Sequence, residues 1–526
     1  MGNEHMEKIS ADVHGKHAIA LARAQRAQRD GASQVKHRWY PSFHIAPPAG
    51  WMNDPNGVAY FKGTYHVFYQ HHPFSPEWGP MHWGHVSSED LVHWKHESIA
   101  LAPSLVEDSG GCWSGSAIEA PNGDLAVIYT GNQWLNGVDD REGKKQSQIL
   151  ALSADGIHFE KYGVVLKSPE GIEDFRDPKI WRDGSLYRMV IGVGVPVREG
   201  QTPQRQEQVS QQRGQVWLYE SDDLIHWEFV QVLYEDPDPL VSMIECPDFI
   251  YLGGKWVLIY GALRPHRLRG YAFRNGHNMG YVSGTWSPRE NFAIEGEIQP
   301  LDWGHDYYAG QTLRLPDPDR RLIVFAWMGG FSLPLASQRE DGWSGQLALP
   351  RELCTGVTGN IVAKPIAELE KLRCESKDYG SFEIGVNETL RLADNAQCVE
   401  IECDVDLDAS SSETIAMLVQ QTSDSHYVLL AYDSQSQRVV LDRGVTSRTN
   451  RGKRSAPAKT SGVLSLRIFL DRASIEVFID GGERCISSLT FPCDVDEARR
   501  AISLASVNGT IAVRRCVIHS LASAVS

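Results

Sequence analysis

Residues 58–70 read VAYFKGTYHVFYQ, two apolar and aromatic runs joined at Lys62 and Gly63. A turn dipeptide between alternating apolar runs is the sequence signal of a β-hairpin. Four later segments repeat this pattern, with turns at Asn122-Gly123, Asp183-Gly184, Gly253-Gly254 and Asp317 to Arg320. A repeat of roughly 60–70 residues is typical of a four-stranded unit, which predicts the blades of a β-propeller.

A second repeated feature has the same spacing as the hairpins. An aromatic residue follows a Ser-rich, acidic turn at Trp94, Phe159, Trp227 and Phe292, with spacings of 65, 68 and 65 residues. We interpret these aromatics as core residues between blades rather than as ligand contacts. Five blades of this size predict a propeller over residues 37–355.

The flanking segments differ from the repeat. Residues 1–36 are polar and rich in Ala, Gln and Arg, which indicates a short helical arm, and residues 356–375 carry the helical spacing Ile366, Leu369, Leu372. Residues 376–526 contain many short alternating strands, which favour an antiparallel β-sandwich. The basic stretch between Arg448 and Lys459 is interpreted as a solvated loop. The expected fold is therefore all-β, a five-bladed propeller followed by a C-terminal sandwich.

Composition excludes several classes of protein. The 526-residue chain has a net charge of −16, so a nucleic-acid partner is not expected. It has no apolar run of the roughly 18 residues that span a bilayer, so no membrane partner is expected either. The N-terminal arm has no apolar signal region, and nine cysteines without Cys-x-x-Cys spacing indicate neither a disulfide framework nor a zinc site. We therefore expect a cytoplasmic protein, and leave open whether it forms homo-oligomers.

Three of the hairpins have a carboxylate at a similar distance before the turn glycine. Asp54, Asp177 and Glu245 stand nine, seven and nine residues before it. Equivalent positions in a propeller converge on one central funnel. Hydrolysis of a glycosidic bond needs one carboxylic acid to protonate the leaving oxygen and one carboxylate facing the anomeric carbon. The three acids therefore predict a catalytic site, although Asp54 taken alone also fits an Asx-turn.

The local sequences suggest different roles for two of these acids. Arg176 and Pro178 flank Asp177, so we expect an ionised, rigidly held carboxylate that accepts hydrogen bonds from sugar hydroxyls. Glu245 has apolar neighbours and other acids nearby, so we expect a raised pKa, as a general acid requires.

Other inner segments supply expected substrate contacts. Trp78 lies in a Pro-bounded loop and is expected to be an exposed stacking platform for a sugar. Six histidines between positions 71 and 96 could suggest a metal, but they lie on strand and loop, and the two carboxylate roles need no metal or cofactor. The expected binding residues are Trp51, Asn53, Gln70, Trp78, Trp113, Ser114, Arg176, Asp306 and Tyr308.

The blocks at residues 51–57 (WMNDPNG), 176–178 (RDP) and 245–246 (EC) resemble the signature blocks of glycoside hydrolase family 32, the family of invertases, fructan hydrolases and sucrose-6-phosphate hydrolases. Residues 302–309 (DWGHDYYA) and 471–478 (DRASIEVF) are similar to further family segments, and the resemblance covers about residues 37 to 520. It implies a propeller joined to a sandwich, and a retaining mechanism on terminal β-fructofuranosyl units. It also implies Asp54 as nucleophile, Asp177 as transition-state stabiliser and Glu245 as acid/base.

Several functions remain open at this stage. The family includes sucrose-6-phosphate hydrolases and fructosyltransferases, which share the same three acids. Related propellers act on arabinose-containing glycans by inversion, with carboxylates roughly 6.5–9.5 Å apart instead of about 5–5.5 Å. A non-catalytic lectin would have aromatic platforms without the acid pair. We expect sucrose and short fructo-oligosaccharides to be preferred over polymeric fructan.

Overall fold

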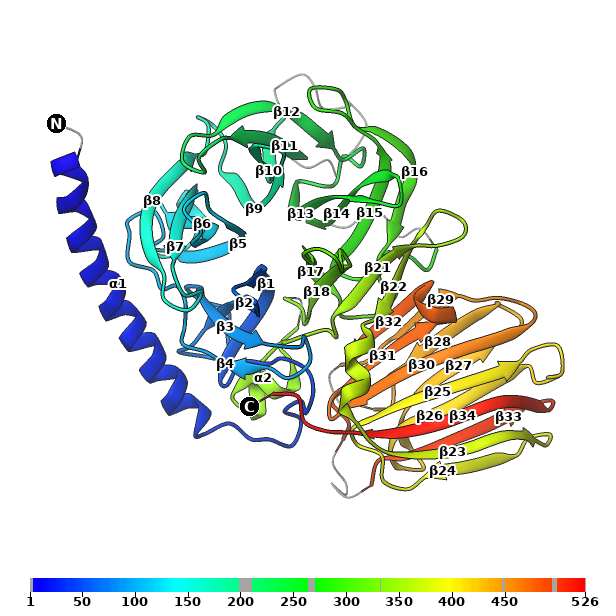
Figure 1. Cartoon of the computed structure of the whole chain (residues 1–526). Helices are drawn as coiled ribbons and strands as arrows, with labels where there is room; N and C mark the ends of the chain where they lie inside the picture. The colour runs from blue at the N-terminus through cyan, green and yellow to red at the C-terminus, as the bar shows by residue number, and fades with distance from the viewer. Residues whose placement is uncertain are drawn as a thin grey trace.

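The structure is a computed structural model that describes residues 3–197, 211–263, 270–331, 333–446, 450–493 and 499–525, with side chains described from residue 15 onward. A long helix, α1 (Asn3–Ala32), precedes two β domains and runs beside the propeller, where it contacts β8 (Figure 1). The N-terminal arm is thus helical, as expected, but at 30 residues it is not short.

The first domain is a closed ring of five sheets. Its innermost strands are β1 (Gly50–Phe61), β5 (Gly111–Glu119), β9 (Asp174–Asp183), β13 (Met243–Leu252) and β17 (Tyr308–Arg314). Each of these strands contacts the next one along the chain, and β17 contacts β1. This closed order makes the domain a five-bladed β-propeller (Figure 1), so the predicted fold class is confirmed.

The outer strands complete each blade. In the first blade they are β2 (Thr64–His72), β3 (His82–Ser88) and β4 (Lys95–His96), and in the second β6 (Leu125–Trp134), β7 (Lys144–Ser153) and β8 (Glu160–Lys167). In the third blade they are β10 (Leu186–Pro196), β11 (Gln212–Ser221) and β12 (Glu228–Glu235), and in the fourth β14 (Lys255–Leu263), β15 (His277–Thr285) and β16 (Ala293–Pro300). In the fifth they are β18 (Leu322–Met328), β21 (Arg351–Thr355) and β22 (Ile361–Pro365). A short strand from beyond the fifth blade, β19 (Trp343–Ser344), pairs with β1, while β20 (Gln346–Leu347) pairs with β18. The five hairpins read from the sequence are the inner strand pairs of the five blades.

The repeated aromatics occupy the positions expected of core residues. Trp94, Phe159 and Phe292 are buried, and Trp227 is half-buried against the core between the second and third blades. Between the domains, the helical linker is shorter than predicted. Only residues Ala367–Leu372 form a 3-10 helix, because β22 still belongs to the fifth blade.

The second domain is a sandwich of two six-stranded sheets around one apolar core. One sheet has the order β23 (Arg373–Ile384), β34 (Ile511–Leu521), β25 (Val399–Asp406), β30 (Val463–Asp471), β31 (Ser474–Ile479) and β32 (Arg484–Leu489). The other has the order β24 (Thr389–Ala393), β33 (Ala501–Val507), β26 (Thr414–Ser423), β27 (His426–Asp433), β28 (Arg438–Asp442) and β29 (Lys453–Pro457).

A buried charge network joins the two domains. His44 lies 2.8 Å from Asp471 and 3.0 Å from Glu476 of the sandwich, and Arg351 bridges Glu476 and Asp302. Burial alone would lower the pKa of His44, but the two carboxylates outweigh burial and raise it to about 9. The ring is therefore an imidazolium at neutral pH, and the network fixes the sandwich against the propeller.

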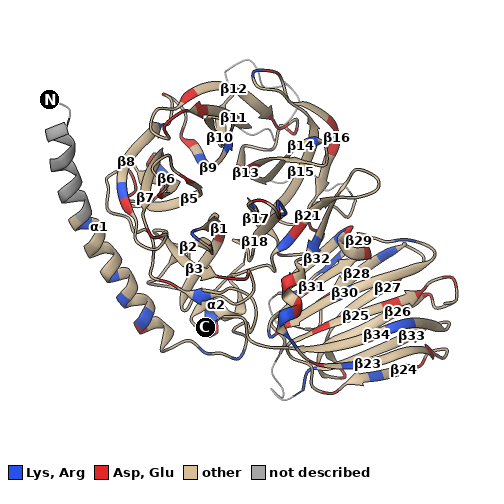
Figure 2. Ribbon diagram, viewed as in Figure 1, with Lys and Arg blue, Asp and Glu red and all other residues tan. Residues whose placement is uncertain are grey.

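The basic stretch between Arg448 and Lys459 is not simply a solvated loop. Residues 447–449 lie outside the described part, but β29 follows them, and Arg454 donates to Asn275 of the propeller at 2.6 and 2.8 Å. Elsewhere, Lys and Arg are interspersed with Asp and Glu on both domains (Figure 2). Within the described residues, no helix is long and apolar enough to cross a membrane.

Candidate active site

Each innermost strand of the propeller carries a β-bulge at the same place. Two residues of the inner strand oppose one residue of its neighbour at positions 53–54, 113–114, 177–178, 246–247 and 309–310. A bulge re-aims side chains and is common beside active sites. Asp54 and Asp177 lie within their bulges and Glu245 directly precedes one, so the bulges direct all three carboxylates into the centre of the ring.

Three of these bulges hold non-glycine residues in a left-handed backbone conformation. The φ angles are 63° at Asp177, 48° at Cys246 and 52° at Ala309. Such conformations cost about 1–3 kcal/mol each and persist only where the surroundings impose them, most often at functional sites.

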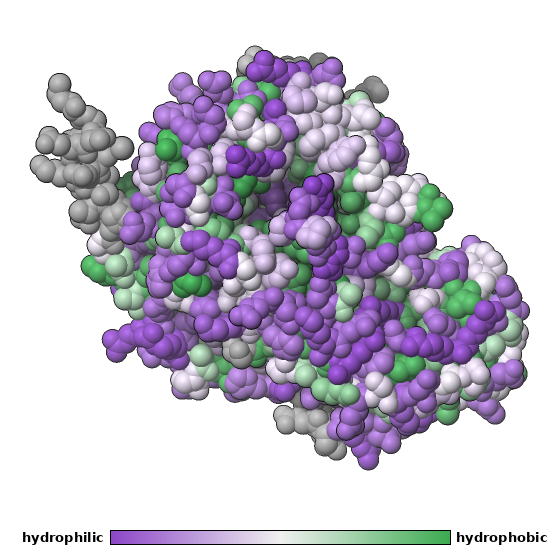
Figure 3. All heavy atoms as spheres, in the orientation of Figure 1, coloured by the Kyte–Doolittle hydropathy of each residue, from purple (hydrophilic) through white to green (hydrophobic). Residues whose placement is uncertain are grey.

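The bulges surround one cavity of about 520 Å³, whose mouth is a hollow in the hydrophilic face of the propeller (Figure 3). This volume is within the range of small-molecule sites. The cavity is lined by Asn53, Asp54, Gln70, Trp78, Trp113, Ser114, Trp134, Val138, Asp139, Asp140, Lys144, Arg176, Asp177, Glu245, Leu263, His277, Tyr308 and Phe331.

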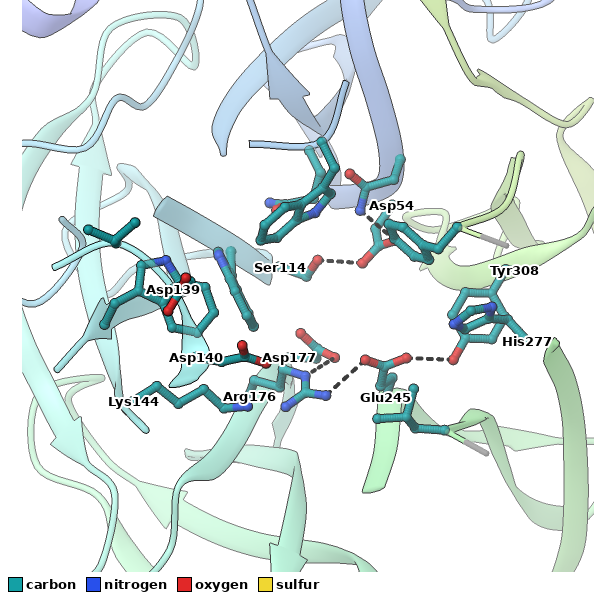
Figure 4. Close-up of a pocket in the computed structure, with 18 residues that line it drawn as sticks. Asp54, Ser114, Asp139, Asp140, Lys144, Arg176, Asp177, Glu245, His277 and Tyr308 are labelled. Atoms are coloured by element: carbon teal, nitrogen blue, oxygen red, sulfur yellow. Dashed lines mark hydrogen bonds and ion pairs between the residues drawn. The ribbon is translucent and has the colours of Figure 1, made fainter. Parts of the chain in front are cut away.

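Asp54 is held on both carboxylate oxygens. Ser114 Oγ donates to Oδ2 at 2.6 Å, and Asn53 Nδ2 donates to Oδ1 at 3.0 Å (Figure 4). Burial raises the pKa of Asp54, the two hydrogen bonds oppose the rise, and the charge of Glu245 adds to it. The carboxylate has a fixed orientation and faces the open centre of the pocket.

Glu245 is also held on both oxygens, by different donors. Arg176 Nη2 donates to Oε1 at 2.8 Å, and the Tyr308 hydroxyl donates to Oε2 at 2.7 Å (Figure 4). Burial would raise the pKa of Glu245, but the guanidinium and the phenol outweigh burial and lower it. Arg176 is anchored in turn by Asp174, at 2.5 Å.

The negative charge of Asp177 is offset less well by hydrogen bonds and nearby cations than that of Glu245. Its Oδ2 accepts the backbone N–H of Cys246 at 2.9 Å, while Arg176 Nε is 4.0 Å away. Burial raises the pKa of Asp177 to about 7, and the charges of Glu245 and Asp54 add to the rise that Arg176 opposes.

The pKa shifts of Asp177 and Glu245 are the reverse of those expected from the sequence. We expected Arg176 to keep Asp177 ionised and Glu245 to have the raised pKa, but the guanidinium lies closer to Glu245, at 2.8 Å, than to Asp177, at 4.0 Å. Adjacency in sequence did not decide the nearer partner of Arg176, because Asp177 lies within a bulge in left-handed backbone and its Oδ2 accepts the backbone N–H of Cys246. Asp177, with a pKa of about 7, is therefore the acid that is partly protonated near neutral pH, whereas the pKa of Glu245 is lowered.

Most of the expected binding residues reach the pocket. Asn53, Gln70, Trp78, Trp113, Ser114, Arg176 and Tyr308 all line it. Trp51 instead lies behind Asn53, to which its indole N–H donates at 2.7 Å. Trp83, five residues after Trp78, is fully buried in the core and does not line the pocket.

Asp306 does not line the pocket. Its Oδ2 accepts from Arg443 and from the backbone N–H of Leu489, both at 2.8 Å, so it belongs to the contact with the sandwich. The physical reason is its position two residues before the strand that carries Tyr308, where the chain still follows the domain interface.

Sequence reasoning missed several lining residues. Trp134 and Lys144 are at the ends of β6 and β7, beyond the predicted hairpin, and His277 comes from the third strand of its blade. None of them had a clear signal in the sequence, because four residues (TGNQ, 130–133) separate Trp134 from the apolar run of the second hairpin. Trp134, Trp113 and Trp78 contact one another edge to face, at 5.7 and 6.0 Å between ring centroids, and form an aromatic wall.

Three of the histidines between positions 71 and 96 make hydrogen bonds to the backbone. His71, His72 and His82 each direct Nδ1 at a backbone carbonyl, at 2.7 to 3.0 Å. Burial lowers the pKa of His71 to about 4 and that of His82 to about 3, so both rings are neutral.

Comparison with known proteins assigns the family. The model of the glycosyl hydrolases family 32 N-terminal domain matches residues 44–365, and that of the family 32 C-terminal domain matches residues 368–520. The chain belongs to glycoside hydrolase family 32. It is accordingly an enzyme, and the recognition made from residues 51–57, 176–178 and 245–246 is confirmed.

Curated relatives cover nearly the whole chain of this family 32 enzyme. A sucrose-6-phosphate hydrolase of Escherichia coli is 40% identical over 96% of this chain and 98% of its own, and a raffinose invertase of Escherichia coli is 38% identical over 93% and 96%. Among solved structures, a β-fructofuranosidase of Bombyx mori has a TM-score of 0.82 at 32% identity, covering 97% of this chain and 99% of its own. A mutant of the latter enzyme in complex with sucrose has a TM-score of 0.81 at 31% identity, with the same coverage.

The raised pKa of Asp177 predicts a pH-dependent effect on stability. Because its pKa in the folded protein lies above its ordinary value of 3.8, ionisation of Asp177 disfavours folding, and this loss of stability develops as pH rises from about 4 through about 7. Asp177→Asn, which tolerates the left-handed backbone, should therefore raise the melting temperature relative to the parent by several degrees at pH 8 and by less at pH 5. Asp222→Asn, at an exposed position, is the control and should show no such difference. A stabilisation that is equal at both pH values would contradict the shift.

Proposed function

We propose that the enzyme is a retaining β-fructofuranosidase, which releases terminal β-D-fructofuranosyl residues from sucrose and short fructo-oligosaccharides. The observation that supports this best is the pairing of two rigidly held carboxylates across one pocket. Asp54 is fixed by Ser114 and Asn53, and Glu245 is fixed by Arg176 and Tyr308. The names of the relatives and of the sucrose complex point to the same substrate class.

In the first step, Asp54 attacks the anomeric carbon of the fructosyl unit and forms a covalent ester. Glu245 donates its proton to the glycosidic oxygen, so that glucose leaves as a neutral alcohol. The proton must therefore reside on Glu245 when substrate is bound. Sugar hydroxyls that donate to Asp177 would favour its ionised form, and this transfers the shared proton toward Glu245.

In the second step, water attacks the same carbon from the face that the leaving group vacated. Glu245, now ionised, accepts a proton from this water, the bond to Asp54 breaks, and the product regains the β configuration. Asp177 stabilises both transition states, because its hydrogen bonds to the sugar strengthen as positive charge develops on the ring.

The shape of the pocket supports action at chain ends. Trp78, Trp113 and Trp134 form one wall near the mouth, and Phe331 stands across from them beside His277, at 5.3 Å between ring centroids. A pocket of about 520 Å³ at the centre of the propeller suits a terminal residue better than the middle of a long polymer.

A phosphorylated substrate is the second candidate. Several curated relatives are named sucrose-6-phosphate hydrolase, and Lys144 lies in the pocket wall beside Arg176, both paired with Asp174. A lysine is a suitable point charge for a phosphate. This candidate also favours a cytoplasmic location, since a sugar phosphate does not leave the compartment where it is made.

The role of Glu245 predicts a dependence on the leaving group. Glu245→Ala should reduce kcat on sucrose by about 10³-fold but spare the first step on an activated fructoside, and azide should restore turnover by replacing water as the nucleophile. The measurement is initial rate with and without azide on both substrates. Tyr308→Phe is a matched control, because it keeps the acid and should gain nothing from azide. Equal losses on both substrates, without rescue, would remove Glu245 from this role.

Substrate preference is tested by kcat/KM on sucrose, sucrose 6-phosphate, kestose, inulin and levan. We expect sucrose and kestose to exceed both polymers by at least about tenfold, because only chain ends enter the pocket. Equal amounts of released glucose and fructose from sucrose would identify hydrolysis rather than fructosyl transfer. A tenfold or larger preference for sucrose 6-phosphate that Lys144→Ala abolishes would replace the proposed substrate with the phosphorylated one.

A further inference from the structure

Helix α1, for which the sequence analysis found no function, is docked on the propeller through its C-terminal half. Ala24 is fully buried, and His17 Nε2 accepts the backbone N–H of Ala102 at 3.3 Å. At the end of the helix, a Cβ atom added at Gly31 would lie 3.0 Å from Cβ of Ala49, the residue that precedes β1. The last turns of α1 therefore lie against the start of the strand that carries Asp54.

From this contact, a chain of hydrogen bonds leads to the pocket. Gln28 Oε1 lies 2.9 Å from His71 Nε2, and His71 Nδ1 lies 2.8 Å from the backbone carbonyl oxygen of Trp51. The indole N–H of Trp51 donates to Asn53 Oδ1 at 2.7 Å, and Asn53 Nδ2 donates to Asp54 Oδ1 at 3.0 Å. Five residues thus connect α1 to the carboxylate that faces the substrate.

The chemistry of the groups fixes the direction of these bonds. The His71 ring is neutral, because burial lowers its pKa to about 4. A carbonyl only accepts, so Nδ1 carries the proton and Nε2 is an acceptor. An amide oxygen cannot donate to Nε2, so the side-chain amide of Gln28, whose oxygen and nitrogen exchange places on rotation, presents its nitrogen there as the donor. An indole N–H only donates, so the amide oxygen of Asn53 must face Trp51 and its nitrogen must face Asp54. Each member of the chain is therefore oriented by its neighbour.

We propose that Gln28 is a positioning residue for Asp54, and that α1 is thereby a functional part of the active site although it does not line the pocket. The proposal rests on the proposed role of Asp54 as nucleophile. Gln28 holds the imidazole of His71, His71 holds the Trp51 backbone at the start of the first bulge, and Trp51 sets the amide that orients the attacking carboxylate. Small displacements of a reacting group are costly to turnover, whereas substrate contacts made by other residues are unaffected.

The test is Gln28→Met, which preserves side-chain length and helix propensity but cannot donate a hydrogen bond. On whichever fructoside the parent hydrolyses best, kcat should fall about tenfold while KM stays within about twofold. Two controls separate this effect from loss of helix docking. Gln25→Met changes the same residue type one turn earlier, and His17→Ala removes a different contact between α1 and the propeller. Both should keep the kcat of the parent.

The outcomes distinguish the inference from the function on which it rests. A Gln28→Met enzyme with unchanged kcat, or with a raised KM at constant kcat, overturns the positioning role while the proposed function stands. So does an equal loss of kcat in Gln25→Met or His17→Ala, since α1 would then act only through its docking. A parent that hydrolyses no fructoside overturns the proposed function and, with it, this inference.

Discussion

Three carboxylates share one buried pocket, and their mutual repulsion is the constraint that organises the site. Arg176 contacts two of them, at 2.8 Å from Glu245 and 4.0 Å from Asp177, while Asp174 anchors the guanidinium from behind. Burial raises the pKa of Asp177 to about 7, and the charges of Glu245 and Asp54 add to the rise that Arg176 only partly opposes. Asp177 is therefore partly protonated near neutral pH. A bound sugar that favours the ionised form of Asp177 shifts this proton to Glu245, the proposed acid.

The propeller is the rigid scaffold that holds the three carboxylates close together. A bulge in every inner strand turns side chains inward at one level, and left-handed backbone at Asp177 and Cys246 stores strain there. The frame is closed by the ring of inner strands and fixed to the sandwich through the buried His44 network. The hydrogen bonds from Gln28 to Asn53 extend this support to α1, outside the ring.

Much of the fold was predictable from sequence, because hairpin turns and the spacing of Trp94, Phe159, Trp227 and Phe292 are local signals. The length of the linker was harder to predict, because strand pairing in the fifth blade decides where the linker begins, whereas α1 fills most of the predicted arm. At the site, residues on the inner strands were found from the repeat. Asp306 was misplaced and Lys144 and His277 were missed, because a domain contact and outer strands decide where these side chains lie. The partner of Arg176 was also misjudged, since the geometry of a bulge is not visible in the sequence.

The central claim is that Asp54 attacks the sugar and carries it covalently. The most direct measurement is mass spectrometry of peptides from the Glu245→Ala enzyme after brief reaction with an activated fructoside, because this variant forms the ester but hydrolyses it slowly. The account predicts a mass increase of one fructosyl unit on the peptide that contains Asp54, located at that residue by fragmentation. A label on Asp177, or an enzyme that turns over the fructoside with inversion at the anomeric carbon and no covalent adduct, would contradict it.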